Sequence, residues 1–330
     1  MISVHIKIVI LFLAGTFFVP GCTTDTPGRE KPISPQGLRP GKHTFTIMVG
    51  RRQRSYVVHV PQNFNKKKGW PVVIMFHGGG GSAKSAMWQT GWAQKADHAK
   101  FLAVFPEGTR ADPSKPARFS VNPQTWNDGS NRKNVGAIKR KVADVDFVAK
   151  MIDDLSRRFK VDKRRIYATG FSNGASMAFQ VGRRFSRKFA AIAPVAGSDW
   201  STQTMIDRPI PVLYITGTAD PLNPFAGGPI RIGSKTYGKK PPVRELIDNW
   251  VRLLGCPAGS RVVYEKDDVK GIAYGPCKQG SELVFYTIDE MGHSWPGGKN
   301  RLPERLVGKS SNSIRATDVI WRFFQKHPKK

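Results

Sequence analysis

Residues 165–185 read RIYATGFSNGASMAFQVGRRF, an apolar run that leads through Gly170-Phe171-Ser172-Asn173-Gly174 into a stretch with helical spacing. The run 166–169 predicts a buried strand and 174–185 a helix, so Ser172 is expected on the tight turn between them. Glycines two residues before and after the serine remove Cβ atoms that would otherwise clash with neighbouring backbone. This G-x-S-x-G pattern, placed at the positive end of a helix, indicates a nucleophilic serine with an exposed hydroxyl.

The segments around this turn alternate between short apolar runs and stretches with helical spacing. The predicted strands are 72–76, 102–105, 166–169, 190–194, 212–215 and 283–288. The predicted helices are 83–99, 142–159, 174–185, 243–254 and 314–325, and an antiparallel hairpin over 45–49 and 55–60 precedes them. Such alternation predicts an α/β fold with a doubly wound, mostly parallel sheet and helices on both faces. Ligands bind such sheets at the carboxyl ends of the strands.

A serine hydroxyl is a weak nucleophile until a base accepts its proton, so a histidine has to reach Ser172. In folds with this turn, the acid and then the histidine follow the serine in the chain. Only His293 and His327 do so; His327 lies in the C-terminal tail, where we expect it to be solvated. His293 comes directly after the predicted strand 283–288, and is therefore the predicted base.

The carboxylate that orients this histidine is expected in a loop after a strand. Asp220 fits best, because the apolar run 212–215 breaks at Gly217 and Pro221 fixes the turn beyond the carboxylate. Asp199, which follows the preceding predicted strand, is the second choice.

A run of four glycines follows the predicted strand 72–76, in the sequence His77-Gly78-Gly79-Gly80-Gly81. Bare backbone lets N–H groups approach a substrate carbonyl closely, so this loop is expected to supply oxyanion donors together with the residue after the nucleophile. We assign Gly79 first, Gly78 second, and the N–H of Asn173 as the partner donor. A phosphate-binding loop is excluded, since no glycine precedes Lys84 as a Walker motif requires.

Three further side chains are predicted to contact substrate: Trp295, which lies two residues from the predicted base, Trp126, and His77. The sequence predicts no metal site, because no His or Cys partners stand at ligand spacing around the cysteines.

The N-terminus is predicted to carry an export signal. An apolar run over 8–19 follows Lys7 and is too short to span a bilayer, so residues 1–21 are predicted to be a signal peptide. Gly21-Cys22 resembles a bacterial lipobox, in which Cys22 is lipidated and becomes the mature N-terminus. An ordinary secretory peptide is the alternative. Lipidation at Cys22 would place the protein on the periplasmic or cell-surface side of a membrane, whereas an ordinary secretory peptide would lead to a secreted protein.

Residues 22–42 are rich in Pro, Gly and charge and are predicted to be a flexible tether before a single catalytic domain over 43–330. If Cys22 carries lipid, Cys256 and Cys277 are left as a pair, and in an oxidising compartment they are expected to form a disulfide.

The formal charge of the 330-residue chain is +29, from 53 Lys and Arg against 24 Asp and Glu. Charge of this size favours anionic surroundings without selecting among them. No helix-turn-helix, RNP or zinc pattern is evident and the chain is predicted to be exported, so nucleic acid is not an expected partner.

Taken together, these residues resemble the polyhydroxybutyrate depolymerase-like and feruloyl esterase family of secreted α/β-hydrolases, including the LpqC-type lipoproteins of mycobacteria. The resemblance covers about residues 43–325 and rests on His77-Gly78-Gly79-Gly80, Thr125-Trp126-Asn127, the turn at Ser172, Gly217-Thr218-Ala219-Asp220, and Gly292-His293-Ser294-Trp295-Pro296-Gly297-Gly298. It implies a triad of Ser172, Asp220 and His293, no cofactor, and hydrolysis of a polyester, of feruloyl or acetyl groups on polysaccharide, or of small esters.

Three functions are consistent with the sequence. The first is a metal-free serine esterase that works through an acyl-enzyme. The second is an acyltransferase with the same residues, which passes the acyl group to an alcohol. The third is a non-catalytic basic lipoprotein that binds anionic polymers, although a binding protein has no need of Ser, Asp and His in this order.

Overall fold

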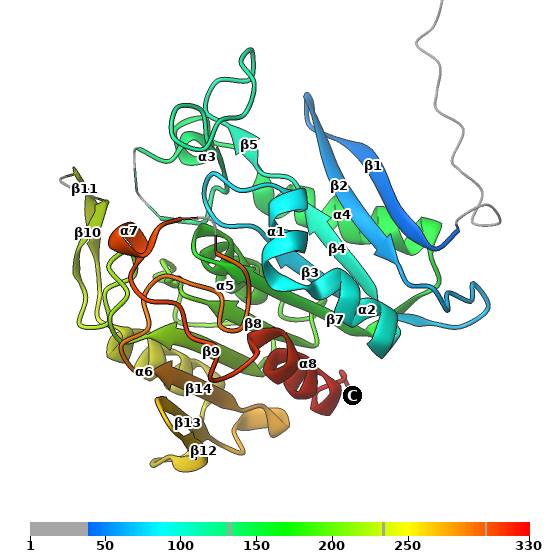
Figure 1. Ribbon diagram of the computed structural model, residues 1–330. Helices are drawn as coiled ribbons and strands as arrows, with labels where there is room; N and C mark the ends of the chain where they lie inside the picture. The colour runs from blue at the N-terminus through cyan, green and yellow to red at the C-terminus, as the bar shows by residue number, and fades with distance from the viewer. Residues whose placement is uncertain (1–38, 131, 133, 233–234, 301) are drawn as a thin grey trace, which may run out of the picture. The chain divides into compact units, whose positions relative to one another are not determined.

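A twisted sheet organises the computed structural model, which describes residues 39–330 except 131, 133, 233–234 and 301 (Figure 1). Its ten strands lie in the spatial order β1 (Gly41–Val49), β2 (Arg52–Val60), β4 (Leu102–Pro106), β3 (Trp70–Phe76), β7 (Val161–Phe171), β8 (Ala191–Val195), β9 (Val212–Gly217), β14 (Leu283–Ile288), β13 (Val269–Tyr274) and β12 (Arg261–Lys266). The six strands from β4 to β14 are parallel, whereas β1–β2 and β12–β13 are antiparallel hairpins at the two edges.

Two further pairs of short strands lie outside this sheet. They are β5 (Thr109–Arg110) with β6 (Gln124–Thr125), and β10 (Gly228–Ile232) with β11 (Lys235–Lys240).

Helices cover both faces of the sheet. One face carries α1 (Ala83–Thr90), α2 (Trp92–Ala99) and α8 (Ala316–Lys326), which face the viewer in Figure 1. The other carries α4 (Asp144–Arg158), α5 (Asn173–Arg184) and α6 (Val243–Leu254). The helices α3 (Gly136–Lys139) and α7 (Glu304–Val307) are single turns in loops.

The core has two layers because strand side chains alternate between the faces. In β3, Val72, Ile74 and Phe76 pack with the helices of one face, while Val73 and Met75 pack with those of the other. All seven residues of β3 are buried, as expected for a central parallel strand covered on both sides.

The predicted doubly wound, mostly parallel sheet is confirmed, as is the hairpin that precedes it. The predicted helix 83–99 is wrong as a single element: Gly91 adopts a left-handed φ of 69° and divides it into α1 and α2. The edge hairpin β12–β13 was not predicted. Its strand β12 lies almost entirely exposed, so its sequence carries no buried alternation.

Cys256 and Cys277 form a disulfide, as predicted, which joins the end of α6 to the loop before β14. Within the described part of the chain, no helix is long and apolar enough to cross a membrane. The signal peptide 1–21, the lipidation at Cys22 and nearly all of the tether 22–42 lie outside the described residues. The first strand begins at Gly41, two residues before the predicted domain boundary.

Candidate active site

Ser172 stands on the turn between β7 and α5, as the sequence predicts. Its φ of 57° and ψ of −122° lie in a region that non-glycine residues rarely adopt, at a cost of about 1–3 kcal/mol. A Cβ on Gly170 would lie 2.1 Å from the Gly174 carbonyl oxygen, and one on Gly174 would lie 2.2 Å from the Phe76 carbonyl oxygen. Only glycine fits at both places, so the surrounding backbone holds Ser172 in its strained turn.

His293 and Asp220 meet although 73 residues separate them. The Nδ1–H of His293 donates to Oδ2 of Asp220 at 2.7 Å, and both side chains are buried. The other carboxylate oxygen, Oδ1, accepts the backbone N–H groups of Leu222 and Asn223, each at 2.8 Å. The carboxylate is therefore held in place, and it fixes the histidine tautomer in which Nε2 is the proton acceptor.

This pair lies against the serine turn. The ring of His293 packs on the ring of Phe171, the residue before Ser172, with a centroid distance of 4.8 Å. Asp220 follows β9 and His293 follows β14, so both come from the carboxyl ends of parallel strands, as does Ser172. The topology thus brings the three predicted residues to one edge of the sheet.

The other candidates for acid and base have different partners. Asp199 accepts the Nε–H of Arg183 at 2.6 Å in a buried ion pair, where burial raises the pKa of its carboxyl group. The expectation of a solvated His327 is wrong, because this side chain is largely buried and its Nε2 lies 3.2 Å from Oε1 of Glu282. In the structure, Asp220 and His293 pair with each other instead.

The glycine loop after β3 lies beside the serine turn. A Cβ on Gly78 would lie 3.4 Å from Cβ of Ser172, and one on Gly79 would lie 3.8 Å from Cβ of Asn173, so both glycines are near the turn. Gly80 donates its N–H to the Gln124 carbonyl at 2.7 Å, and Gly81 donates to the Gly78 carbonyl at 2.9 Å. These two N–H groups are thereby engaged within the loop, which leaves Gly78 and Gly79 as the candidate oxyanion donors.

Asn173 is the first residue of α5, where the backbone N–H has no acceptor within the helix. That N–H is the candidate partner donor of the glycine loop.

The imidazole of His77 links the glycine loop to the segment that carries Gly108. Its Nδ1–H donates to the Gly78 carbonyl at 2.8 Å, and its Nε2 accepts the Gly108 N–H at 2.9 Å. Burial lowers the pKa of His77 to about 4, so the imidazole is neutral near pH 7. Only 1% of the residue is exposed, which makes His77 a part of the scaffold in this structure rather than a surface for substrate.

The two tryptophans predicted to contact substrate are buried as well. Trp126 is fully buried, and its indole N–H donates to the His77 carbonyl at 2.9 Å. Trp295 is 3% exposed and donates to Oγ1 of Thr317 at 3.1 Å. Here both rings pack the loops around the site and offer almost no open surface.

The side chain of Asn173 clamps the turn to the segment that carries Trp126. Its Oδ1 accepts the Trp126 N–H at 2.8 Å, and its Nδ2 donates to the Trp126 carbonyl at 3.2 Å and to Oδ2 of Asp128 at 2.7 Å. Trp126 in turn holds His77, next to the glycine loop. This network links the two segments that carry the candidate oxyanion donors. The motif Thr125-Trp126-Asn127 pointed to the region, but nothing in the sequence predicted the role of Asp128.

Asn173→Ala tests this clamp, because alanine keeps the backbone N–H and loses only the amide. We expect kcat for p-nitrophenyl acetate to fall about 10- to 100-fold with KM nearly unchanged, since a displaced donor weakens binding of the transition state more than of the substrate. Affinity for a boronic acid, a transition-state analogue, is expected to fall in parallel.

Asn127→Ala is the matched control, because it removes another side-chain amide from the same segment, one that donates to the Val142 carbonyl at 2.8 Å. Its kcat is expected to stay within about threefold of the wild type. A similar loss of kcat in both variants would show that the Asn173 side chain acts through general stability alone.

The structure also places an exposed aromatic ring beside the glycine loop, which the sequence did not predict. Phe119 is 56% exposed, yet a Cβ on Gly80 would lie only 2.6 Å from its Cδ2, so the ring rests on the Gly80 backbone. Asn122 secures this loop, because its buried Nδ2 donates to the carbonyls of Asp112, Lys115 and Pro116 at 2.8–3.1 Å.

Among the described residues, no group of three or more His, Cys, Asp or Glu side chains is arranged to hold a metal ion. The arrangement offers acid–base chemistry through His293 and a hydroxyl nucleophile at Ser172.

Comparisons with known proteins give the relatives of this chain. Residues 63–230 match the family model described as phospholipase/carboxylesterase. The chain is 29% identical over 296 residues to a protein named as esterase NocK of Nocardia uniformis subsp. tsuyamanensis, covering 84% of this chain and 80% of that one. It is 23% identical to feruloyl esterase D of Neurospora crassa, covering 99% of both chains.

A third relative is longer than the matched region. Poly(3-hydroxyalkanoate) depolymerase C of Paucimonas lemoignei is 27% identical, and the match covers 72% of this chain but 58% of that enzyme. Among solved structures, an acetyl xylan esterase from Aspergillus awamori superimposes with a TM-score of 0.53 at 13% identity, covering 76% of this chain and 94% of that one. These likenesses confirm the α/β-hydrolase fold and the predicted resemblance to feruloyl esterases and polyhydroxyalkanoate depolymerases.

Proposed function

The chain belongs to the phospholipase/carboxylesterase family and is a carboxylic ester hydrolase, and from this premise we propose that Ser172, His293 and Asp220 perform its reaction through an acyl-enzyme. The observation that carries the proposal is the 2.7 Å hydrogen bond between His293 and Asp220, made directly beside the strained serine turn.

The first half of the reaction acylates the serine. Oγ of Ser172 attacks the ester carbonyl carbon while Nε2 of His293 takes the hydroxyl proton, and Asp220 stabilises the imidazolium without accepting a proton itself. The carbonyl oxygen becomes an oxyanion and accepts the N–H groups of Asn173 and of Gly79 or Gly78. The bond to the alcohol oxygen then breaks, and His293 returns the proton to the leaving alcohol.

The second half repeats these steps with water. His293 takes a proton from water as the water oxygen attacks the acyl carbon, and the bond to Ser172 Oγ breaks as His293 returns that proton to the serine. The products are the free carboxylic acid and the enzyme in its starting state.

The substrate class follows from the relatives and from the exposed loop. Two relatives are named as feruloyl and polyhydroxyalkanoate enzymes, whose acyl groups are larger than acetate, whereas a similar solved structure is named as an acetyl xylan esterase. The exposed ring of Phe119 beside the glycine loop supports an apolar acyl group here. A panel of methyl ferulate, acetylated xylan, hydroxybutyrate oligomers and p-nitrophenyl esters of rising chain length tests this, and a preference for acetyl esters throughout contradicts it.

Phe119→Ala is expected to raise KM for p-nitrophenyl hexanoate and methyl ferulate about tenfold and to leave p-nitrophenyl acetate unchanged. Covering one aromatic face with an apolar acyl chain accounts for a factor of this size. The control is Val262→Ala, which removes another exposed apolar side chain, 53% exposed on the edge strand β12. Equal effects on the acetyl and hexanoyl esters would remove Phe119 from acyl recognition.

We further propose that the protein is exported and anchored through lipid at Cys22. The apolar run 8–19 and Gly21-Cys22 support this, and the Cys256–Cys277 disulfide fits an oxidising compartment. Incorporation of labelled palmitate that disappears in Cys22→Ser tests the anchor.

A further inference from the structure

Cations gather at the edge of the sheet that lies opposite the candidate site, where the parallel strands begin. We call this surface the basic face; its members are Lys42, Lys67, Lys68, Lys160, Lys163, Arg164, Arg187, Lys188, Arg208, Lys329 and Lys330. They come from the segments that precede β3, β7, β8 and β9, from the first residues of β1 and β7, and from the C-terminal residues. Because β3, β7, β8 and β9 are parallel, the segments that precede these four strands share one edge.

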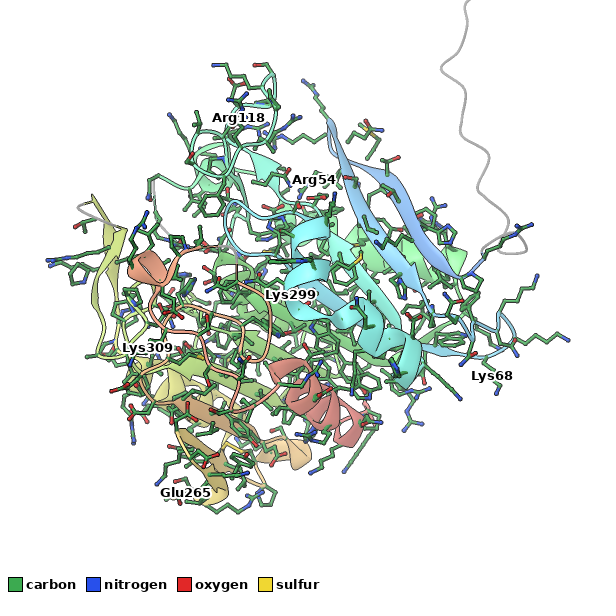
Figure 2. The ribbon with its side chains drawn as sticks, in the orientation of Figure 1. Arg54, Lys68, Arg118, Glu265, Lys299 and Lys309 are labelled. Atoms are coloured by element: carbon green, nitrogen blue, oxygen red, sulfur yellow. A yellow bond between two sulfur atoms is a disulfide. The ribbon has the colours of Figure 1, made fainter. Side chains whose placement is uncertain are left out.

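Hydrogen bonds tie the first half of the basic face together. The Trp70 N–H donates to the Lys160 carbonyl at 2.8 Å, and Nζ of Lys160 donates to the Lys67 carbonyl at 2.9 Å. Gly41 pairs with Val60 at the end of β2, and β2 runs antiparallel to β4, so the start of β1 lies at the same edge as the start of β4. Figure 2 shows Lys68 on the side where β1 begins and Arg118 on the opposite side.

The C-terminal residues join the same surface. The Lys329 N–H donates to the Arg164 carbonyl and Nε of Arg164 donates to the Lys329 carbonyl, each at 2.8 Å. Nζ of Lys329 donates to the carbonyls of Arg187 and Lys188 at 3.0 and 3.1 Å. Burial, and then the charges of Arg208, Lys163 and Lys188, lower the pKa of Lys329, as expected where cations crowd together.

Carboxylates neutralise the basic face only in part. Asp153 pairs with Lys188, and Asp207 with Arg187, at 3.3 and 3.7 Å. Another group of cations keeps an unneutralised charge: no carboxylate of the described residues lies within 4 Å of the ammonium groups of Lys67, Lys68, Lys163 and Lys330. These four side chains are exposed, and their unneutralised positive charge favours a polyanionic partner.

The place where the chain enters the domain supports a membrane surface as that partner. Cys22 precedes Gly41 by 19 residues, a covalent reach of at most about 70 Å, and Gly41 lies at the edge of the basic face. A lipid on Cys22 would therefore keep the basic face at high effective concentration near the membrane surface. One lipid signal combined with a basic patch is a general way to make membrane attachment stable.

We propose that the basic face docks on anionic lipid headgroups of the membrane that carries Cys22; the inference rests on the lipid anchor proposed above and not on the esterase chemistry. The 11 residues of β7 run from the basic face to the candidate site and separate them by roughly 35 Å. This distance is several Debye lengths at physiological salt. The candidate site consequently faces away from the bilayer, and its ester substrate arrives from the aqueous side.

The test uses the full chain with Cys22→Ser, so that lipid on Cys22 cannot contribute. Binding is measured by sedimentation with vesicles of phosphatidylglycerol and phosphatidylcholine, and with vesicles of phosphatidylcholine alone. In that background, K67E/K68E/K163E/K330E reverses four charges on the basic face. The matched control K84E/R118E/K139E/K239E reverses four exposed charges in segments that follow β3, β4, β6 and β9.

We expect the wild-type surface to prefer anionic vesicles and the basic-face variant to bind them at least about a hundredfold more weakly, whereas the control loses less than tenfold. Both variants carry the same net charge, so an equal loss in the two overturns the proposal. Absence of any preference for anionic over neutral vesicles overturns it too. So does unchanged vesicle binding in a basic-face variant that no longer binds polygalacturonate, because that result identifies an anionic polysaccharide as the partner.

Hydrogen exchange of the unaltered chain keeps the proposal testable if a variant fails to fold. Anionic vesicles are expected to protect residues 62–68 and 159–165 and to leave 109–122 unchanged; the reverse pattern contradicts docking through the basic face. Hydrolysis of p-nitrophenyl acetate without vesicles is expected to be unaffected in the basic-face variant. A chain that binds vesicles but hydrolyses no ester therefore contradicts only the proposed function.

Discussion

Ser172→Ala is expected to lower kcat/KM for p-nitrophenyl acetate by about a millionfold, to the residual level set by substrate binding and the oxyanion donors. The reason is the loss of the nucleophilic oxygen: no acyl-enzyme forms, and His293 has no hydroxyl to deprotonate. His293→Ala is expected to act similarly. The double variant is expected to lose little more than either alone, because nucleophile and base act as a unit.

Ser176→Ala is the control for this prediction. Ser176 lies one turn along α5 from Ser172, is buried, and accepts the Ser198 N–H at 3.2 Å, a structural contact. Its kcat/KM is expected to remain within about threefold of the wild type, and thermal unfolding monitors the fold of both variants. Wild-type turnover in a folded Ser172→Ala protein, or a wild-type chain that never reacts with a fluorophosphonate, would refute the role of Ser172.

Asp220→Asn is expected to reduce kcat about ten-thousandfold while leaving KM for the same ester largely unchanged. The amide has no negative charge to stabilise the imidazolium, and it favours the tautomer with the proton on the wrong nitrogen. Both backbone N–H groups that donate to Oδ1 have an acceptor in the amide oxygen, so the loop itself is expected to keep its form.

Asp199→Asn provides the comparison, because Asp199 is the other carboxylate that the sequence offered. Its buried ion pair with Arg183 is broken in this variant, at a cost of about 3–5 kcal/mol of unfolding free energy, while the His293–Asp220 pair is untouched. We expect the free energy of unfolding of Asp199→Asn to fall and the kcat of the folded variant to stay near the wild-type value. If Asp199→Asn loses activity as severely as Asp220→Asn, the assignment of the acid is wrong.

Much of the central sheet was predictable because its strands are fully buried. A strand covered on both faces has to be apolar along its whole length, and β3, β4, β8 and β9 each show this as a short continuous run. The edge strand β12 lacks such a run because solvent covers it. β12 joins the sheet through its pairing with β13, and its own side chains show no alternation from which that pairing could be predicted.

The roles of buried aromatic residues near the site were harder to predict. Trp126 and Trp295 lie close to predicted functional residues in the chain, which suggested walls of a pocket. The structure turns both indoles inward, toward the His77 carbonyl and the Thr317 hydroxyl. The side on which a large ring packs depends on the volume that neighbouring elements leave open, and that volume is a property of the assembled core.

The sequence by itself determined the serine turn, because the constraint there is local: two glycines at fixed spacing, a buried strand before them and a helix after them are all read within twenty residues. The tertiary structure alone decided which carboxylate meets the histidine. Asp199 and Asp220 both follow buried strands; Gly217 and Pro221 made Asp220 the first choice, but only the fold shows what each carboxylate meets, an arginine from α5 for Asp199 and His293 for Asp220. Such pairings join residues far apart in the chain, so their geometry exists only once the sheet has formed.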